Sequence, residues 1–412
     1  MKPSLLASLL RDNPIAITGM GSYSAAGDSV EALWRASLAA RGLASWREFP
    51  SSNGQPLRFA VCGAPEINGS LSGPRFARKA GRCVQMAILA ANQAWEQAGL
   101  NTSYPPERLG VITGSSRGPL AKITESVDRL QQAMGPSVST QSSMGAVSGV
   151  LAQCFGLKGP SAVASATCAS GAFAIALAAE QILLGKADAM LVGGVDAPLH
   201  AVVLAQLESC GVLGSHVEPG QTCRPFDVTR NGMVLGEGSA FLVLESAELA
   251  ARRGAKPLAR LAGWSMITDS SGRAGVHEDG SSILRAMENA LALAQLSLRE
   301  IAYVNAHGSG TVANDLAEAR ALSRLFGDHG VPCSSTKPVT GHCLGATPAL
   351  EAILCVESLR HQILPPAMNC TQPDPLCPVR LANGCAPAAF KSVLSNSLGF
   401  WGYHASLVFS TA

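Results

Sequence analysis

Cys168 is the residue whose setting best suits covalent chemistry. It lies in the segment Ser165-Ala-Thr-Cys168-Ala-Ser-Gly171, just before an apolar run that predicts a helix from Ala169 to about Leu184. A thiol in the first turn of a helix faces unpaired backbone N–H groups and the positive end of the helix dipole, and both favour the thiolate over the thiol. None of the other cysteines has this setting. We therefore expect Cys168 to act as a nucleophile.

Three histidines and a lysine lie in glycine-rich segments next to predicted strands or helices. His307 follows a predicted strand, where α/β folds place their ligand sites. Lys337 and His342 share one segment that leads into a helix, and His404 lies in a segment between two strands. The glycines around them allow the backbone to approach a ligand closely. These segments are therefore the candidates for a functional site.

Each of these residues also has a purely structural interpretation. A helix cysteine is most often a small buried hydrophobic residue, and a single histidine at a strand end is more often structural than catalytic. Zinc would need several Cys or His ligands, but here they lie far apart in the sequence without any C-x-x-C pair. We expect no metal site.

The composition narrows the class of protein. The chain has 412 residues, is 47% hydrophobic and 15% charged, and carries a formal net charge of +2. Such a chain can bury a large core, and its scattered Lys and Arg argue against a nucleic-acid partner. No stretch reaches the about 18 apolar residues of a membrane span, and the N-terminus shows no leader peptide with a cleavage site. We expect a protein of the reducing cytoplasm.

Short apolar runs alternate with alanine-rich helical patterns, which is typical of a layered α/β fold whose strands are covered on both faces. The first series of strands is predicted at residues 15–18, 109–113, 161–164, 189–192 and 240–245. The second series is predicted at residues 258–267, 301–305, 331–334, 393–395 and 405–409. Helices are predicted at residues 81–98, 168–185, 281–294, 315–326 and 349–359, and a loop at residues 365–387. We therefore expect two similar halves, residues 1–255 and 256–412.

Together, Cys168, His307 and His342 resemble the Cys-His-His set of the β-ketoacyl-acyl carrier protein synthases of the elongating class. Further blocks match this family in the same order along nearly the whole chain: residues 189–196, 223–238 and 307–318. Thiolases place a second cysteine in the C-terminal glycine-rich loop, and chain-initiating synthases pair one histidine with an asparagine, so neither fits as well. The resemblance implies a thiolase-like α/β fold, with two similar βαβαβαββ halves in five α-β-α-β-α layers.

The resemblance also implies a role for each site residue. Cys168 would accept an acyl group from a carrier-protein thioester, and the N–H groups of Cys168 and Phe400 would form an oxyanion hole. His307 and His342 would stabilise the enolate that forms when a malonyl thioester loses CO₂, so both should be neutral. Phe400 and Trp401 would form a gate. The supporting residues would be Lys337, Asp315, Glu318 and Glu351, with the carboxylates anchoring the lysine or forming a structural ion-pair network. No cofactor is implied.

The implied partners are an acidic acyl carrier protein and a second subunit. Basic residues near the cleft would receive the carrier: Arg75, Arg78, Lys79 and Arg117. Members of the family are dimers, so we expect a homodimer, with a heterodimer of two ketosynthase-like subunits as the alternative.

Two residues depart from the family pattern in the C-terminal loop. Trp401 replaces a glycine beside Phe400, which should stiffen the loop, and His404 replaces an asparagine behind the site. These changes favour a specialised synthase, for a polyketide, a polyene or an unusual acyl chain. Two further hypotheses remain open. One is a chain-length-factor-like, non-catalytic subunit, although such subunits usually lose the cysteine. The other is an enzyme that loads Cys168 without completing the condensation.

Overall fold

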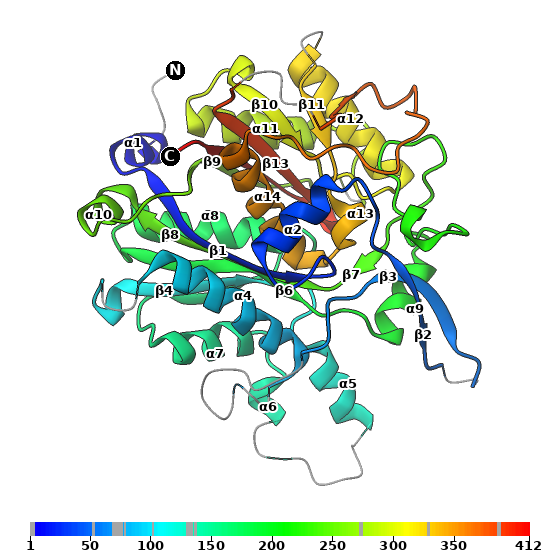
Figure 1. Ribbon diagram of the computed structural model, residues 1–412, viewed down its shortest axis with the longest axis horizontal. Helices are drawn as coiled ribbons and strands as arrows, with labels where there is room; N and C mark the ends of the chain where they lie inside the picture. The colour runs from blue at the N-terminus through cyan, green and yellow to red at the C-terminus, as the bar shows by residue number, and fades with distance from the viewer. Residues whose placement is uncertain are drawn as a thin grey trace.

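The structure is a computed structural model that describes residues 5–51, 54–67, 77, 80–100, 103–128, 135, 138–271, 275–327, 330–384 and 389–412. A single sheet of eleven strands runs through the described part of the molecule, and helices lie on both of its faces and between its two halves (Figure 1).

The first half of the chain forms five neighbouring strands of this sheet. They are β1 (Ile15–Ser24), β4 (Leu109–Gly114), β5 (Ser161–Ala164), β6 (Ala189–Asp196) and β8 (Gly238–Ser246). Their order is β5-β4-β6-β8-β1. β4 runs parallel to β5 and β6, whereas β8 runs antiparallel to β6 and β1.

The second half repeats this arrangement. Its strands are β9 (Ala259–Thr268), β10 (Ile301–Asn305), β11 (Pro332–Ser334), β13 (Ser392–Leu398) and β14 (Tyr403–Ser410), with β12 (Arg380–Leu381) added at the edge. The order β11-β10-β13-β14-β9 and the strand directions match those of the first half, strand for strand. The two halves join where β1 pairs with β9 over three residue pairs. The prediction of two similar five-stranded halves is confirmed.

The main helices complete five layers (Figure 1). α4 (Arg82–Ala98) and α7 (Ala146–Phe155) cover the outer face of the first half, and α11 (Ser281–Ala294) and α12 (Val312–Phe326) form the outer layer of the second half. Between the two halves lie α8 (Ser170–Leu183) and α14 (Thr347–His361), which contact strands of both and each other. This is the predicted α-β-α-β-α order.

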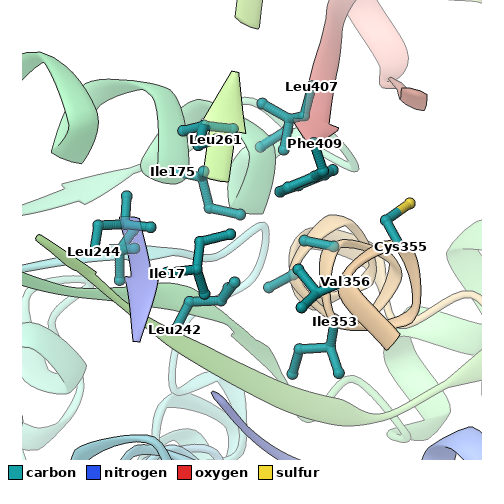
Figure 2. Packing of buried hydrophobic residues seen from close by; sticks show 14 of the residues in the cluster. Ile17, Ile175, Leu242, Leu244, Leu261, Ile353, Cys355, Val356, Leu407 and Phe409 are labelled. Carbon is teal, nitrogen blue, oxygen red and sulfur yellow. The ribbon is translucent and has the colours of Figure 1, made fainter. Parts of the chain in front are cut away.

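The middle layer holds the largest hydrophobic cluster. Figure 2 shows Ile17 of β1 and Leu242 of β8 beside α14, where Ile353 and Val356 lie close to them. Leu407 of β14 approaches the same cluster from the second half. Thirteen of the fifteen residues of α14 are buried, so apolar residues occur on all of its faces, and its two buried glutamates, Glu351 and Glu357, form ion pairs.

The remaining elements are short. The helices are α1 (Leu5–Asp12), α2 (Val30–Leu38), α5 (Leu120–Asp128), α6 (Val138–Gln141), α9 (Ala201–Ser209), α10 (Ala247–Arg252) and α13 (Lys337–Thr340). A separate sheet of three strands is formed by β2 (Ser45–Phe49), β3 (Leu57–Cys62) and β7 (Leu235–Gly236). The sequence did not predict this sheet. β2 is largely exposed and lacks an apolar run, whereas the short apolar run at residues 59–62 of β3 is a signal that was missed. The predicted loop at residues 365–387 is irregular over its described part, apart from β12.

Candidate active site

One cavity of about 560 Å³ contains the main residues that the sequence singled out. Its lining includes Cys168, His307, His342, Phe400 and Trp401. These residues follow the carboxyl ends of four strands: β5, β10, β11 and β13. β10, β11 and β13 run parallel, and segments that follow parallel strands gather at one edge of a sheet. Cys168 comes from the first half, and the segment after β13 packs on the turn that carries it.

Cys168 lies ahead of helix α8 rather than in its first turn, so the predicted position is wrong by two residues. Ala169 is the N-cap of the helix, and Thr167 has a left-handed backbone with φ +49°. The hydroxyl of Ser170 accepts the N–H of Ala166 at 2.9 Å and donates to the carbonyl of Thr167 at 2.6 Å. This turn holds the cysteine at the helix entrance with 7% of the residue exposed.

The Cys168 thiol is protonated at neutral pH. Burial raises its pKa to about 12, while the nearby charges of Lys337 and Arg117 lower it. The backbone N–H of Phe400 donates to the sulfur and also lowers the pKa. Burial thus opposes the preference for the thiolate that the sequence predicts, because the cost of burying an anion exceeds these attractions. The proton has to leave when the sulfur attacks.

The loop between β13 and β14 packs directly on the cysteine turn. A Cβ on Gly399 would lie 2.2 Å from the Thr167 hydroxyl oxygen and 3.3 Å from the Cys168 nitrogen, so only glycine fits. The Thr167 hydroxyl donates to the carbonyl of Phe400 at 3.2 Å. This packing keeps the Phe400 N–H at the Cys168 sulfur.

Phe400 and Trp401 border the cavity from this loop. Phe400 is 36% exposed and Trp401 is 64% exposed. Trp401 has a left-handed backbone, with φ 63° and ψ 22°, a conformation that glycine adopts far more readily than other residues. The tryptophan therefore occupies a position whose backbone favours glycine.

His342 presents a hydrogen-bond donor to the cavity. The N–H of Leu344 donates to His342 Nδ1 at 3.2 Å, and the Thr347 hydroxyl lies at the same distance from this atom. An Nδ1 that accepts a hydrogen bond carries no proton, so in the neutral ring the proton sits on Nε2. Burial, followed by the charge of Lys337, lowers the pKa of His342 well below its usual value and keeps the ring neutral.

His307 faces His342 across the cavity. The two rings lie edge to face, with their centroids 5.2 Å apart. The backbone N–H groups of His307 and Gly308 each donate to a carboxylate oxygen of Glu318 at 2.8 Å. Burial is again the main cause that holds the pKa of His307 well below its usual value, with Lys337 adding to it. Both rings are therefore neutral at pH 7.

Lys337 connects the two histidine segments. Its ammonium group donates to the carbonyl oxygen of His307 and to Glu351 Oε1, the latter at 2.7 Å. The lysine is fully buried, and Glu351 is 1% exposed. Burial raises the pKa of Glu351 to about 7, although the lysine acts in the opposite direction. Of the three predicted carboxylates, only Glu351 pairs with the lysine among the described residues.

Glu318 and Asp315 bind backbone N–H groups instead. Besides the His307 segment, Glu318 accepts the side-chain amide of Asn396 at 3.2 Å. Asp315 accepts the N–H of Phe226 at 2.9 Å and that of Gly310 at 3.2 Å. Both carboxylates lie outside the cavity lining and hold the shape of the loops that form it.

Two family profiles together match most of the chain. "Beta-ketoacyl synthase, N-terminal domain" matches residues 12–250, and "Beta-ketoacyl synthase, C-terminal domain" matches residues 258–371. The chain belongs to the β-ketoacyl synthase family. The resemblance of its motifs is thereby confirmed, and the chain is a condensing enzyme of the ketoacyl synthase type.

Individual relatives span almost the whole length of this family member. It is 34% identical to the 3-oxoacyl-[acyl-carrier-protein] synthase 2 of Vibrio cholerae, over 96% of this chain and 98% of the relative. It is 32% identical to the putative polyketide beta-ketoacyl synthase 1 of Streptomyces halstedii, over 96% and 97%. The solved ishigamide ketosynthase/chain length factor is 30% identical, with a TM-score of 0.88, over 97% of this chain and 99% of that one.

Asp196 is a site-supporting residue of this β-ketoacyl synthase that the sequence did not single out. Its carboxylate accepts the N–H groups of Ser116, Arg117 and Gly345 at 2.7–2.9 Å and the hydroxyl of Ser115 at 2.8 Å. It thereby ties the segment after β4 to the segment after β11. Burial raises its pKa to about 6. Asp196 could have been recognised in the sequence because it is a carboxylate at the end of an otherwise apolar strand.

His404 lies buried behind the site, at the position where the family usually has asparagine. It is 0% exposed, and neither ring nitrogen has a hydrogen-bond partner within the described chain. Burial lowers its pKa to about 4, so the ring is neutral at pH 7. His404 lies outside the cavity lining and is close enough to His307 to lower its pKa further.

The residues expected to receive the carrier protein fall into two groups. Arg75, Arg78 and Lys79 lie outside the described residues. Arg117 lies inside them, and its side chain lines the same cavity as Cys168.

The described residues contain neither a metal-binding cluster nor a membrane-spanning helix. No group of three or more His, Cys, Asp or Glu there could hold a metal ion. The eleven described cysteines are free thiols. No described helix has the length and apolar character needed to cross a membrane.

Proposed function

We propose that this chain is a 3-oxoacyl-carrier-protein synthase, which elongates an acyl chain held on Cys168 by decarboxylative Claisen condensation. The observation that carries the proposal is the single cavity in which one buried thiol meets two neutral histidines. That combination suits a thioester exchange followed by formation of an enolate, without a cofactor.

In the first step, the sulfur of Cys168 attacks the acyl thioester of a carrier protein. A new C–S bond forms, the carrier thiolate leaves, and the thiol proton of Cys168 ends on the carrier sulfur. The N–H groups of Cys168 and Phe400 stabilise the oxyanion, and such donors each contribute about 3–4 kcal/mol in other enzymes.

In the second step, the malonyl thioester loses CO₂ beside the acylated cysteine. His342 donates from Nε2 to the thioester oxygen, because Leu344 already occupies Nδ1. His307 donates from the opposite side of the cavity. The carbanion then attacks the acyl carbon and releases the Cys168 thiolate, which takes up a proton. The product is a β-ketoacyl thioester two carbons longer.

The supporting residues keep the histidines neutral and in place. Lys337 raises the cost of protonating either ring and holds the His307 carbonyl. Glu351 balances the lysine charge, while Glu318 and Asp315 fix the loops. In this scheme residues 1–255 supply the nucleophile and residues 256–412 supply the histidines.

We further propose a carrier protein as the donor of both thioesters, and a dimer as the working form. The name of the Vibrio relative supports the carrier, and the ketosynthase/chain length factor structure supports pairing with a second subunit. We place the protein in the cytoplasm, a compartment in which the free thiols of the described cysteines persist.

A chain-length-factor-like role is the second candidate, and the strained Trp401 beside the cysteine favours it. A stiff, bulky loop at this position would restrict access to the thiol. The retained Cys168, His307 and His342 favour the catalytic role.

Intact mass spectrometry separates these functions. We expect the purified chain to gain one acyl group from an acyl-carrier protein, and to release an elongated product after malonyl-carrier protein is added. Cys168→Ala should abolish the adduct, while Cys210→Ala, which removes an exposed thiol, should keep it. His307→Ala and His342→Ala should still be acylated but should not elongate.

Three other outcomes of this experiment would contradict the proposed function or the assigned roles. An unacylated wild-type chain, even with a partner subunit present, would indicate the non-catalytic role. Acylation without elongation would indicate an enzyme that only loads Cys168. Normal elongation by both histidine variants would refute their assigned roles.

A further inference from the structure

Arg117 lies in the segment of the first half that corresponds to the His307 segment of the second half. Arg117 follows β4. In the strand order of the two halves, β4 corresponds to β10, and the segment after β10 carries His307. The backbone N–H of Arg117 donates to Asp196 Oδ1 at 2.9 Å, which fixes the segment. Its side chain lines the cavity together with Cys168.

Within the described part of the chain, the guanidinium group of Arg117 has no carboxylate partner. Among the described residues, its recorded side-chain contact is Gln206 Oε1 at 3.4 Å. Three other partly or fully buried arginines pair with carboxylates at 2.6–2.7 Å: Arg82 with Glu237, Arg230 with Asp374 and Arg253 with Glu245. Buried Arg224 instead donates to the carbonyl of Thr229 and to Asn231 Oδ1. A partly buried cation without a counter-charge is costly, which favours a ligand that brings oxygen atoms to it.

The surroundings of Arg117 are otherwise suited to a hydrocarbon chain. Leu207 and Leu344 line the cavity and are 2% and 3% exposed. Both belong to the same apolar cluster as Cys168, and so does Met233. An acyl group on Cys168 would therefore extend over apolar side chains and meet one cation.

We propose that Arg117 makes the cavity selective for acyl chains that carry a carboxylate or ketone oxygen over chains of plain hydrocarbon. This inference rests on the proposed acylation of Cys168. A guanidinium group donates several hydrogen bonds in one plane to oxygen acceptors, and an alkyl end offers it none. A hydrocarbon chain would desolvate the cation without compensation.

Docking of the acidic carrier protein is the competing role for Arg117. Trp401 and Val312 are exposed residues of the cavity, at 64% and 57%, whereas Arg117 is only partly exposed and its charge acts on the buried Cys168 sulfur. This placement favours contact with the acyl chain.

Acylation rates with matched thioesters test the proposal. Hexanoyl-, 5-oxohexanoyl- and adipoyl-pantetheine have similar length and differ in the oxygen at the far end. We expect the wild-type chain to gain the adipoyl or 5-oxohexanoyl group about tenfold or more faster than the hexanoyl group, measured as kcat/KM by intact mass. Arg117→Gln should bring the ratio close to one. Because the cation also favours the Cys168 anion, the variant can lower all three rates together, so the ratio of rates is the readout. Arg117→Lys should restore part of the preference for adipoyl.

Gln206→Ala is the matched control, because it removes the amide that contacts Arg117 and leaves the cation. Its ratio should stay within about twofold of the wild type. A ratio near one in a wild-type chain that accepts hexanoyl would overturn this inference and leave the proposed function standing. Acylation by none of the thioesters, with carrier-bound substrates also failing, would overturn both. An Arg117→Gln variant that is slowed equally for all three carrier-bound chains, but unaffected with pantetheine thioesters, would assign Arg117 to carrier docking instead.

Discussion

At the scale of single residues, the Cys168 thiol determines how the first step has to work. Lys337, Arg117 and the Phe400 N–H all favour the anion, yet burial keeps the proton on the sulfur. An approaching thioester displaces solvent from the cavity and brings its own leaving group to take the proton. The resting thiol also protects the cysteine, because the thiolate is the form that oxidants and alkylating agents attack.

This raised pKa predicts the pH dependence of alkylation. Below the pKa the thiolate fraction rises about tenfold for each pH unit, so the rate at Cys168 should still be rising at pH 10. The measurement is intact mass after limited treatment with iodoacetamide, using Cys210→Ala to remove the exposed thiol. Cys168→Ala in that background gives the baseline. A rate that levels off near pH 7 would mean a thiolate stabilised by the helix, and would contradict the burial argument.

The residues of the site could be predicted from the sequence, but their hydrogen-bond partners could not. Cys168, His307 and His342 stand out because each lies in a distinctive glycine-rich or small-residue segment. The contacts of Glu318 with two backbone N–H groups, and of Leu344 with the His342 ring, depend on how loops close in space. Asp196 escaped notice for the same reason, since its four donors come from two segments far from it in the sequence.

At the scale of elements, the strands were predicted well because buried strands are nearly continuous apolar runs. β10 has the predicted bounds, as does helix α11. α12 begins at Val312 rather than Asp315, because Thr311 takes the N-cap position. The turn before α8 was misplaced because the left-handed conformation of Thr167 has no sequence signal.

The loop between β13 and β14 stores strain at Trp401. A left-handed backbone costs a residue with a Cβ about 1–2 kcal/mol, and glycine avoids that cost but loses more entropy on folding. We expect Trp401→Gly to have a free energy of unfolding about 1 kcal/mol above that of Trp401→Ala, measured by urea denaturation. Alanine serves as the matched control because it removes the ring and keeps the strain. Equal stability of the two variants would show that the loop relaxes.

At the scale of the whole molecule, the sheet ends at β5, which has a neighbouring strand on one side only among the described residues. β5 is the last strand of the first half, and Ser161 and Ala162 are exposed. The carbonyls of Pro160 and Ala164 accept bonds from the β4 side, so the alternation of the backbone turns the N–H of Val163 away from β4. An exposed edge of this kind is suited to pairing with a second chain.

Val163→Pro tests whether this edge forms the dimer. Proline removes the outward N–H and is tolerated at a sheet edge, so the fold should survive. The dissociation constant of the dimer should rise by about tenfold or more. Sedimentation velocity measures the association, and Val163→Thr, which keeps the N–H, should remain dimeric. A proline variant that associates as strongly as the wild type would place the interface elsewhere.

The buried middle layer has a consequence for the synthesis of the chain. α8 leaves the ribosome as part of the first 255 residues, long before α14 and the second set of strands exist to cover it. A helix that is apolar all round stays exposed, and prone to aggregation, during that interval. The pocket of Cys168, at the entrance of this helix, includes Phe400 and Trp401, so it is complete only when nearly the whole chain has been made. The active site can therefore form only after nearly the whole mRNA has been translated.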